Sequence, residues 1–439
     1  MAVEAQFPSW AGNELAFPPS LSEFVLEPQV WAPTGWQPLR ASEPGVWSFP
    51  SPTGDELPVR VRYALDLDGM SSEGGRRRDR WERRLVRAHN GVLQISPLAL
   101  LLRPKDQSTL HVRVAFDAPA PLSWVSGIQF AEDSTPERPV HRTRSLFLEH
   151  APYTALGVFE QHALELEDAR VELVIPAGEE LEASTAELLE WVESSWRRVA
   201  KYYDRAPVPR LLIALAPQGR GSPFGLAQGN AGASIRVSYP RRMDAEDLRT
   251  DWVLTHEMIH TGMPGLAPAH DWLEEGMATY VEAIARAREG VLDRDRMWRN
   301  FRRSMPYGQP DSNDGGLDET RSWGRVYWGG ALFCFWVDVE LRRASNNAIG
   351  LEQALRGIQT AGGDARQRWS MQQTIEAMEA GSGLGIVTEL YDRVDDDPIP
   401  MPLNELLAEL GVISDGSSVR YDDEAPLAHV RRALDGSAR

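Results

Sequence analysis

Two histidines four residues apart, His256 and His260, are the clearest chemical signal in this sequence. In a helix, residues at this spacing lie one turn apart on the same side, so both imidazoles can bind one metal ion. Glu257 follows the first histidine and would lie near the ion, where it can accept a proton from a bound water. The HExxH pattern at residues 256–260 therefore predicts a zinc site, provided that the chain supplies a third ligand.

A helix must present these side chains, and we expect it to run from about residue 245 to residue 262. Its buried face is predicted by four residues at helical spacing, Leu248, Trp252, Thr255 and Ile259. A metzincin arrangement would need glycine and histidine three and six residues after the second histidine. It is excluded because those positions are Met263 and Leu266.

The third ligand is expected from a second helix, residues 271–289, which follows a loop that contains proline and glycine. Catalytic zinc uses three protein ligands and keeps one position for water, and two histidines with one glutamate form an established set. Glu274, Glu275 and His270 are the candidates in this region. The ligand preference of zinc alone does not separate them.

The segment WLEEGMATYVE, residues 272–282, resembles the W-L-x-E-G-x-A-x-Y-x-E segment of gluzincin aminopeptidases. In that family the glutamate before the glycine ligates zinc, and this position is Glu275, 15 residues after His260. The resemblance thus implies one Zn2+ ion held by His256, His260 and Glu275. For Glu282 we expect a solvent-facing position, with an outer contact to a ligating histidine as the alternative.

A second segment, VYWGGALF at residues 326–333, is similar to the Y-x-x-G segment that opens a buried helix in the same family. There the tyrosine hydroxyl stabilises an oxyanion, which implies this role for Tyr327. An ordinary half-buried tyrosine is the alternative. Residues 331–351 and 401–411 also look like the glycyl-aminopeptidase branch, and the matches together span roughly residues 220 to 412.

A third segment, QGNAG at residues 228–232, is similar in part to the G-x-M-E-N-x-G strand beside the substrate in this family. The similarity implies four substrate-binding residues, Gly229, Asn230, Ala231 and Gly232. The family's glutamate, which grips the free amine of the substrate, is replaced by Gly229, so exopeptidase specificity does not follow. Turn composition alone offers another explanation, a flexible loop at residues 225–232.

The resemblance implies a zinc-dependent peptidase, aminopeptidase-like and acting on peptide substrates. Glu257 would serve as the general base and Tyr327 as the oxyanion donor. One alternative is a zinc hydrolase of a non-peptide electrophile such as an epoxide. Another is a non-catalytic zinc-containing binding or scaffold protein, although structural zinc sites usually fill all four positions with Cys or His.

Composition and length narrow the function classes further. With 439 residues we expect two or three packed units, and 42% hydrophobic with 25% charged residues is typical of a globular protein. A net charge of −18 argues against a nucleic-acid partner. Cys334 is the only cysteine, so an internal disulfide is excluded, and its apolar surroundings predict a buried, inert thiol.

No apolar run reaches the roughly 18 residues that a membrane span needs, and the first ten residues lack the features of a signal peptide. The chain as given is therefore expected in the cytoplasm, or in the periplasm or medium if a signal peptide has been removed. Its oligomeric state does not follow from the sequence.

The fold class implied is α+β and multidomain. We expect a β-rich N-terminal domain at residues 1–180, a thermolysin-like catalytic domain at 181–291 and a helical domain at 292–439 that completes the active-site cleft. Apolar residues alternate in 59–65 and in 112–116, as half-buried strands require.

Three local patterns complete the sequence-based expectations. A capping box at Ser184 and Glu187 predicts the start of a long helix. Seven arginines at residues 73–89 indicate a solvated loop or strand face rather than a docking surface. The acids at residues 395–397 indicate a solvated turn, with a calcium site as the alternative.

Overall fold

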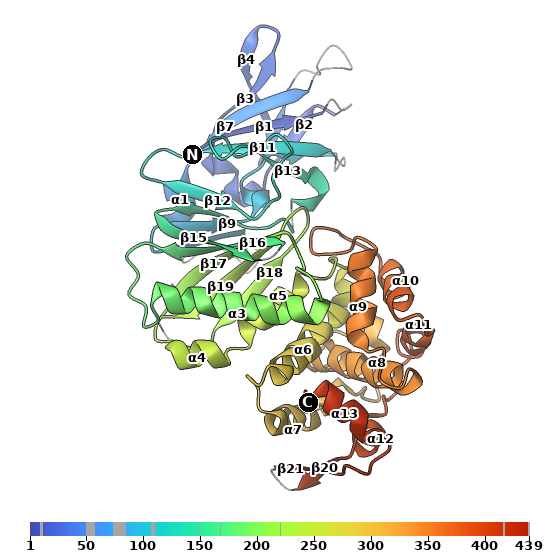
Figure 1. Cartoon of the computed structure of the whole chain (residues 1–439). Helices are drawn as coiled ribbons and strands as arrows, with labels where there is room; N and C mark the ends of the chain where they lie inside the picture. Colours follow the sequence, from blue (N-terminus) through green and yellow to red (C-terminus); the bar gives the residue numbers. More distant parts are fainter. Residues whose placement is uncertain are drawn as a thin grey trace. The chain divides into compact units, whose positions relative to one another are not determined.

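The computed structural model describes the chain apart from residues 9–11, 50–57, 73–84, 107–109, 149, 167, 220, 416–417 and 438–439. Within the described residues the chain combines several β-sheets with many helices, which confirms the α+β class (Figure 1). It forms two compact units. Unit 1 comprises residues 1–181 and 210–242, and unit 2 comprises residues 182–209 and 243–439. The division into three domains at residues 180 and 291 stays a prediction.

Three antiparallel sheets make up the first part of unit 1. The largest has six strands, in the order β13 (His141–Arg144), β11 (His111–Asp117), β1 (Ala2–Phe7), β7 (Val59–Leu65), β3 (Val25–Ala32) and β4 (Gly35–Pro38). The second has the order β10 (Arg103–Pro104), β2 (Glu14–Ala16), β6 (Val46–Ser48) and β5 (Arg40–Glu43). The third has the order β12 (Ser123–Ser126), β14 (Thr154–Gly157), β9 (Val92–Ile95) and β8 (Val86–His89). The short α-helix α1 (Leu67–Ser72) also belongs to this part.

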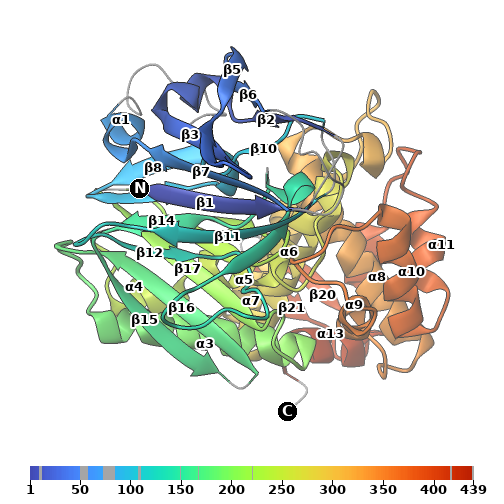
Figure 2. The same cartoon turned by 90° about the horizontal axis from the view of Figure 1, so that it is seen from above.

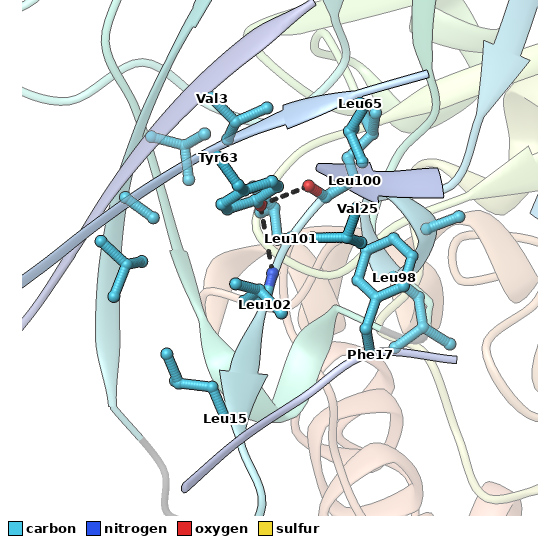
Figure 3. Close-up of a cluster of buried hydrophobic side chains, with 14 of the residues drawn as sticks. Val3, Leu15, Phe17, Val25, Tyr63, Leu65, Leu98, Leu100, Leu101 and Leu102 are labelled. Carbon is cyan, nitrogen blue, oxygen red and sulfur yellow. Dashed lines mark hydrogen bonds between the residues drawn. The ribbon is translucent and has the colours of Figure 1, made fainter. Parts of the chain in front are cut away.

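The alternation expected for β7 is confirmed, because every second side chain from Val59 to Leu65 is buried. The strand β11 alternates in the same way. Figure 3 shows the resulting core, in which the Tyr63 hydroxyl donates to the carbonyl of Leu100 at 2.5 Å and accepts from the amide of Leu102 at 3.2 Å. Burial raises the pKa of Tyr63, so the hydroxyl keeps its proton and satisfies both backbone groups.

A mixed five-stranded sheet completes unit 1. Its order is β15 (Phe159–Leu166), β16 (Ala169–Pro176), β17 (Arg210–Gln218), β19 (Ser234–Pro240) and β18 (Phe224–Gln228). The pairs β16–β17 and β17–β19 are parallel, whereas β15 and β18 are antiparallel edge strands. Figure 2 shows β15 beside β16. The short buried strand expected at residues 211–215 lies in β17 and is confirmed.

Unit 2 is mainly helical. Its α-helices are α3 (Thr185–Tyr203), α4 (Ala245–Thr250), α5 (Val253–His260), α6 (Asp271–Arg288), α7 (Arg294–Ser304), α8 (Gly330–Ala344), α9 (Leu351–Thr360), α10 (Met371–Ser382), α11 (Ile386–Tyr391), α12 (Leu403–Glu409) and α13 (Ala428–Leu434). A hairpin of β20 (Val412–Asp415) and β21 (Ser418–Tyr421) is added near the end. The capping box that opens α3 is present as predicted. None of the described helices is both long and apolar enough to cross a membrane.

The single helix expected at residues 245–262 is wrong, because the structure has two helices, α4 and α5. Asp251 separates them. Its carboxylate accepts hydrogen bonds from the amides of Val253 and Leu254, at 3.2 Å and 3.0 Å, and so caps a new helix. Trp252, which was expected on the buried face, precedes this helix and is exposed.

Two of the remaining local expectations are met, and one lies partly outside the described residues. Cys334 is buried without a disulfide partner, and burial raises the pKa of its thiol. The acids at 395–397 lie in a turn whose backbone carbonyls accept from residues 316 and 318. Among the described residues they form no candidate cation site. Residues 73–84 of the arginine-rich segment lie outside the described residues.

Candidate metal centre

The helix α5 presents His256, Glu257 and His260 within slightly more than one turn. The two imidazole rings lie 5.0 Å apart between centroids and are inclined by 78°. His256 and Glu257 are buried, and His260 is half-buried. The HExxH segment is therefore largely shielded from water, and charges interact more strongly there than in bulk water.

The helix α6 brings Glu275 to the two histidines. Its Oε2 atom lies 3.3 Å from Nε2 of His256 and 3.6 Å from Nε2 of His260, and the two Nε2 atoms are 3.3 Å apart. Ligand atoms about 2.0–2.2 Å from a tetrahedral zinc ion would lie about 3.3–3.6 Å from one another. The three protein atoms therefore have the spacing of three corners of a zinc coordination tetrahedron.

No other group of this kind occurs in the part of the chain that the structure describes. His256, His260 and Glu275 are the one set of three or more His, Cys, Asp or Glu residues whose possible ligand atoms all lie within 4.8 Å of one another. Three protein ligands leave one tetrahedral position for water, as catalytic zinc sites require. The structure brings together the three residues expected to be ligands, and their binding of zinc stays a prediction.

The two rival ligands have other partners. Oε1 of Glu274 accepts a hydrogen bond from the amide of Leu266 at 2.7 Å, and burial raises the pKa of this carboxyl to about 7. Nδ1 of His270 lies 3.0 Å from a carboxylate oxygen of Asp318. The geometry therefore favours Glu275 over both.

The charges within the site interact strongly. Burial opposes ionisation of Glu275, but the two histidines outweigh it through charge and hydrogen bonds, and they hold the pKa of this carboxyl well below its usual range. Burial likewise tends to lower the pKa of His260, yet Glu275 raises it to about 9. Zinc ligation requires a neutral imidazole, so zinc would compete with a proton on His260.

Tyr327 lies beside these residues, in a π-helical turn at Arg325–Gly329 that leads into α8. Its ring is stacked on that of His256, with centroids 6.4 Å apart and an angle of 17°. Burial raises the pKa of Tyr327, and the charge of Glu275 and a hydrogen bond to it raise the pKa further. The hydroxyl is therefore protonated at neutral pH and can donate a hydrogen bond in the site.

A close backbone contact positions the π-helical turn that carries Tyr327 against α6. A Cβ atom on Gly276 would lie 2.2 Å from the Cα atom of Gly330, and one on Gly330 would lie 1.9 Å from the carbonyl oxygen of Trp272. Only glycine permits backbones to approach so closely. This contact lies one residue after Glu275 and three residues after Tyr327.

Glu282 is not solvent-facing, which corrects the sequence-based expectation. Its side chain is 13% exposed and lies 3.1 Å from Nη1 of Arg286, which follows it by one helical turn. Burial raises the pKa of Glu282, and the charge of Arg286 opposes this shift. Arg286 also donates to the carbonyl of Thr250 at 2.6 Å, so the pair joins α6 to the end of α4.

Two further positioning contacts were missed in the sequence. Arg198 of α3 donates at 2.8 Å to the hydroxyl of Thr255, the residue before His256. Asp318 accepts at 2.8 Å from the indole of Trp272 and at 2.7 Å from the hydroxyl of Tyr391. Both contacts join residues that are far apart in the sequence, so no local sequence pattern predicts them.

The residues expected to bind substrate belong to unit 1. Asn230 and Ala231 have positive φ values of 64° and 65°, and the carbonyl of Ala231 accepts from the amide of Gln129 at 2.8 Å. Gly232 forms a β-bridge with Ile128. These contacts hold residues 230–232 in one conformation, which argues against a flexible loop there. The substrate-binding role of Gly229, Asn230, Ala231 and Gly232 stays a prediction.

Comparisons with known proteins identify solved structures that have a similar fold. Protein-family models and curated proteins give no match to this sequence. Among solved structures, the chain is similar to an aminopeptidase N family protein from Idiomarina loihiensis, with a TM-score of 0.69 and 15% identity over 97% of this chain and 79% of that one. It is also similar to an M1 zinc metallopeptidase from Deinococcus radiodurans, with a TM-score of 0.52 and 16% identity over 91% of each chain. A variant of that enzyme bound to a Tyr-Ser-Ala substrate gives a TM-score of 0.51.

These matches cover most of the chain at identities of 15–16%, so they concern the course of the backbone. The expected resemblance to the gluzincin aminopeptidase clan is confirmed at this level. The closer assignment to the glycyl-aminopeptidase branch stays a prediction. The chain has the fold of the M1 zinc metallopeptidases.

Proposed function

We propose that this protein is a zinc-dependent peptidase whose metal is held by His256, His260 and Glu275. The observation that carries the proposal is the spacing of the three donor atoms, 3.3, 3.3 and 3.6 Å, which suits one tetrahedral ion. The reaction class is supported by the M1 zinc metallopeptidases that share the fold, one of which binds a Tyr-Ser-Ala substrate.

Each chemical role in this proposal has one residue. When bound, zinc would lower the pKa of a water toward 7 and polarise the carbonyl of the peptide bond. Glu257 accepts a proton from the attacking water and returns it to the nitrogen of the leaving amine as the C–N bond breaks. Tyr327 donates a hydrogen bond to the carbonyl oxygen as negative charge develops there.

The proposed substrate includes peptides with either free or blocked N-termini. In the gluzincin aminopeptidases a glutamate grips the free amine, and the corresponding position here is Gly229, which offers only its backbone. We propose that residues 229–232 contact the backbone of the peptide. Comparing matched peptides with free and acetylated N-termini would separate an exopeptidase from an endopeptidase.

The test is a Glu257→Gln variant studied by metal analysis and by mass spectrometry of a degenerate peptide library. Both the variant and the natural protein should bind one zinc per chain, but the variant should cut no peptide, because an amide cannot accept the proton. Undiminished cleavage would contradict the mechanism. An epoxide hydrolysed by the natural protein while all peptides stay intact would favour the zinc hydrolase of a non-peptide electrophile. If chelation unfolds the chain and no substrate is ever turned over, a zinc-containing scaffold is the better explanation.

A further inference from the structure

Two tryptophans expose their indole rings beside the candidate metal centre. Trp252 is 49% exposed and Trp323 is 66% exposed, and both belong to unit 2. Aromatic side chains of this size gain most from burial, so exposed rings next to a candidate site indicate a surface that a ligand covers.

The two rings end a row of aromatic contacts that passes through the candidate site. Trp323 stacks on Tyr327, with centroids 5.3 Å apart and an angle of 29°. Tyr327 stacks in turn on His256, and Trp252 stands perpendicular to His256 at 5.6 Å. One exposed indole thus adjoins the proposed oxyanion donor, and the other adjoins a proposed zinc ligand.

Local chain geometry explains why both rings stay outside the core. Because the carboxylate of Asp251 caps α5, this helix begins after Trp252. The Trp252 side chain therefore does not belong to the buried face of α5. Trp323 lies two residues before the π-helical turn that carries Tyr327. Each indole is therefore presented by the start of the same element that presents a site residue.

We propose that Trp252 and Trp323 form an aromatic clamp that binds large apolar side chains, above all aromatic ones, on the two sides of the peptide bond that is cut. This inference rests on the proposed peptidase function. In an extended peptide, neighbouring residues are about 3.3–3.4 Å apart and their side chains point to opposite faces. Rings 5.3 and 5.6 Å from Tyr327 and His256 are therefore within reach of the residues that flank a carbonyl at the metal. Aromatic pairs also attract beyond the area that they bury.

The experiment compares four zinc-loaded proteins on two matched peptide series, with Phe or Ala on each side of the bond that the natural protein cuts. The proteins are the natural chain, Trp323→Ala, Trp323→Phe and Trp31→Ala. Trp31 is a matched control, because it is 48% exposed and also contacts one neighbouring ring, Trp36 at 5.3 Å, but lies in unit 1.

Trp323→Ala should raise KM for the Phe peptide at least tenfold more than for the Ala peptide. Trp323→Phe should restore most of the preference, and Trp31→Ala should leave it unchanged. An equal rise in KM for both peptides, or a fall in kcat with unchanged KM, would overturn the clamp. Either result would mean that Trp323 only supports Tyr327. The clamp would also be overturned if the natural protein preferred peptides with Lys or Ser beside the bond that is cut.

A binding measurement separates the clamp from the peptidase function. Glu257→Gln loaded with zinc should bind the Phe peptide at least tenfold more tightly than the Ala peptide by calorimetry, and adding Trp252→Ala should remove most of this difference. If the natural chain cuts the Phe and Ala peptides with equal efficiency, the clamp is refuted and the peptidase function stands. Binding selectivity without any cleavage would support the clamp and refute the peptidase function.

Discussion

The Cα atom of Gly330 lies 2.2 Å from the point that a Cβ atom on Gly276 would occupy. The backbones of α6 and α8 thus come into close contact at two glycines, directly after Glu275 and shortly after Tyr327. The separation between the proposed third ligand and the proposed oxyanion donor therefore depends on two residues that take no part in the chemistry.

Gly276→Ala should destabilise the chain and lower its zinc content, because the added methyl forces α6 and α8 apart. Alanine is usually better than glycine in a helix by about 1 kcal/mol, but overpacking of a closed contact costs about 1–3 kcal/mol and reverses the sign. Thermal unfolding and metal analysis measure both effects. Gly219→Ala is the control, since a Cβ atom there meets nothing within 4 Å. Unchanged stability and zinc content in Gly276→Ala would contradict this role of the contact.

Glu275→Gln should weaken zinc binding by at least tenfold, whereas Glu274→Gln should keep it near the natural value. The two residues are adjacent and chemically alike, but only Glu275 lies 3.3 Å from Nε2 of His256. A glutamine at position 274 can still accept from the amide of Leu266, so its local structure is preserved. Titration with a zinc chelator compares the two variants. The reverse order of affinities would assign the ligand to Glu274.

Asp318→Ala should lower the free energy of unfolding by about 2–4 kcal/mol, because it leaves donors of Trp272 and Tyr391 without their acceptor. The start of α6 would lose a support, so the midpoint of thermal unfolding should fall. Asp397→Ala removes an exposed carboxylate from the nearby turn and should have little effect. Equal midpoints for the two variants would show that the Asp318 contacts contribute nothing to stability.

His141 should make the stability of the chain fall between pH 6.5 and pH 4. Its ring is buried and stacked on Phe130, and burial lowers its pKa from 6.5 to about 4. The unfolded chain therefore binds a proton first as the pH falls. The stabilising contribution is complete above pH 6.5 and is lost as the pH approaches 4, with about 2 kcal/mol lost between pH 7 and pH 5.

Unfolding in urea at pH 7, 6 and 5 measures this loss. His141→Gln should flatten the dependence on pH, whereas the same change at the exposed His111 should leave it in place. The interpretation fails if both variants keep the slope of the natural chain.

The parts of the site that follow from sequence are those set by local spacing. The histidine pair, the bounds of α6 and the choice of Glu275 all came from residues within one or two helical turns or from a matching segment. The break at Asp251 was missed, although aspartate is a favoured cap, because the apolar spacing continued across it. The Glu282–Arg286 pair has a local signal, opposite charges four residues apart, which is the spacing of an ion pair on one helix face.

Other features have no local signal. Asp318 meets Trp272 across 46 residues and Tyr391 across 73, and Arg198 meets Thr255 across 57. Such contacts depend on how helices pack, which the side-chain pattern of a single helix does not specify. The same holds for the π-helical turn at Tyr327, which the sequence did not predict. This turn depends on close backbone contacts. Gly308 lies against Trp328 and Gly329 of the turn, and Gly276 lies against Gly330, the next residue.

The most direct test of the central claim is an anomalous-scattering map of zinc in crystals of the metal-loaded protein. We predict one peak bonded at about 2.0–2.2 Å to Nε2 of His256, Nε2 of His260 and a carboxylate oxygen of Glu275, with a water as the fourth ligand. A peak elsewhere, or a fourth protein atom bound to the ion, would contradict the account.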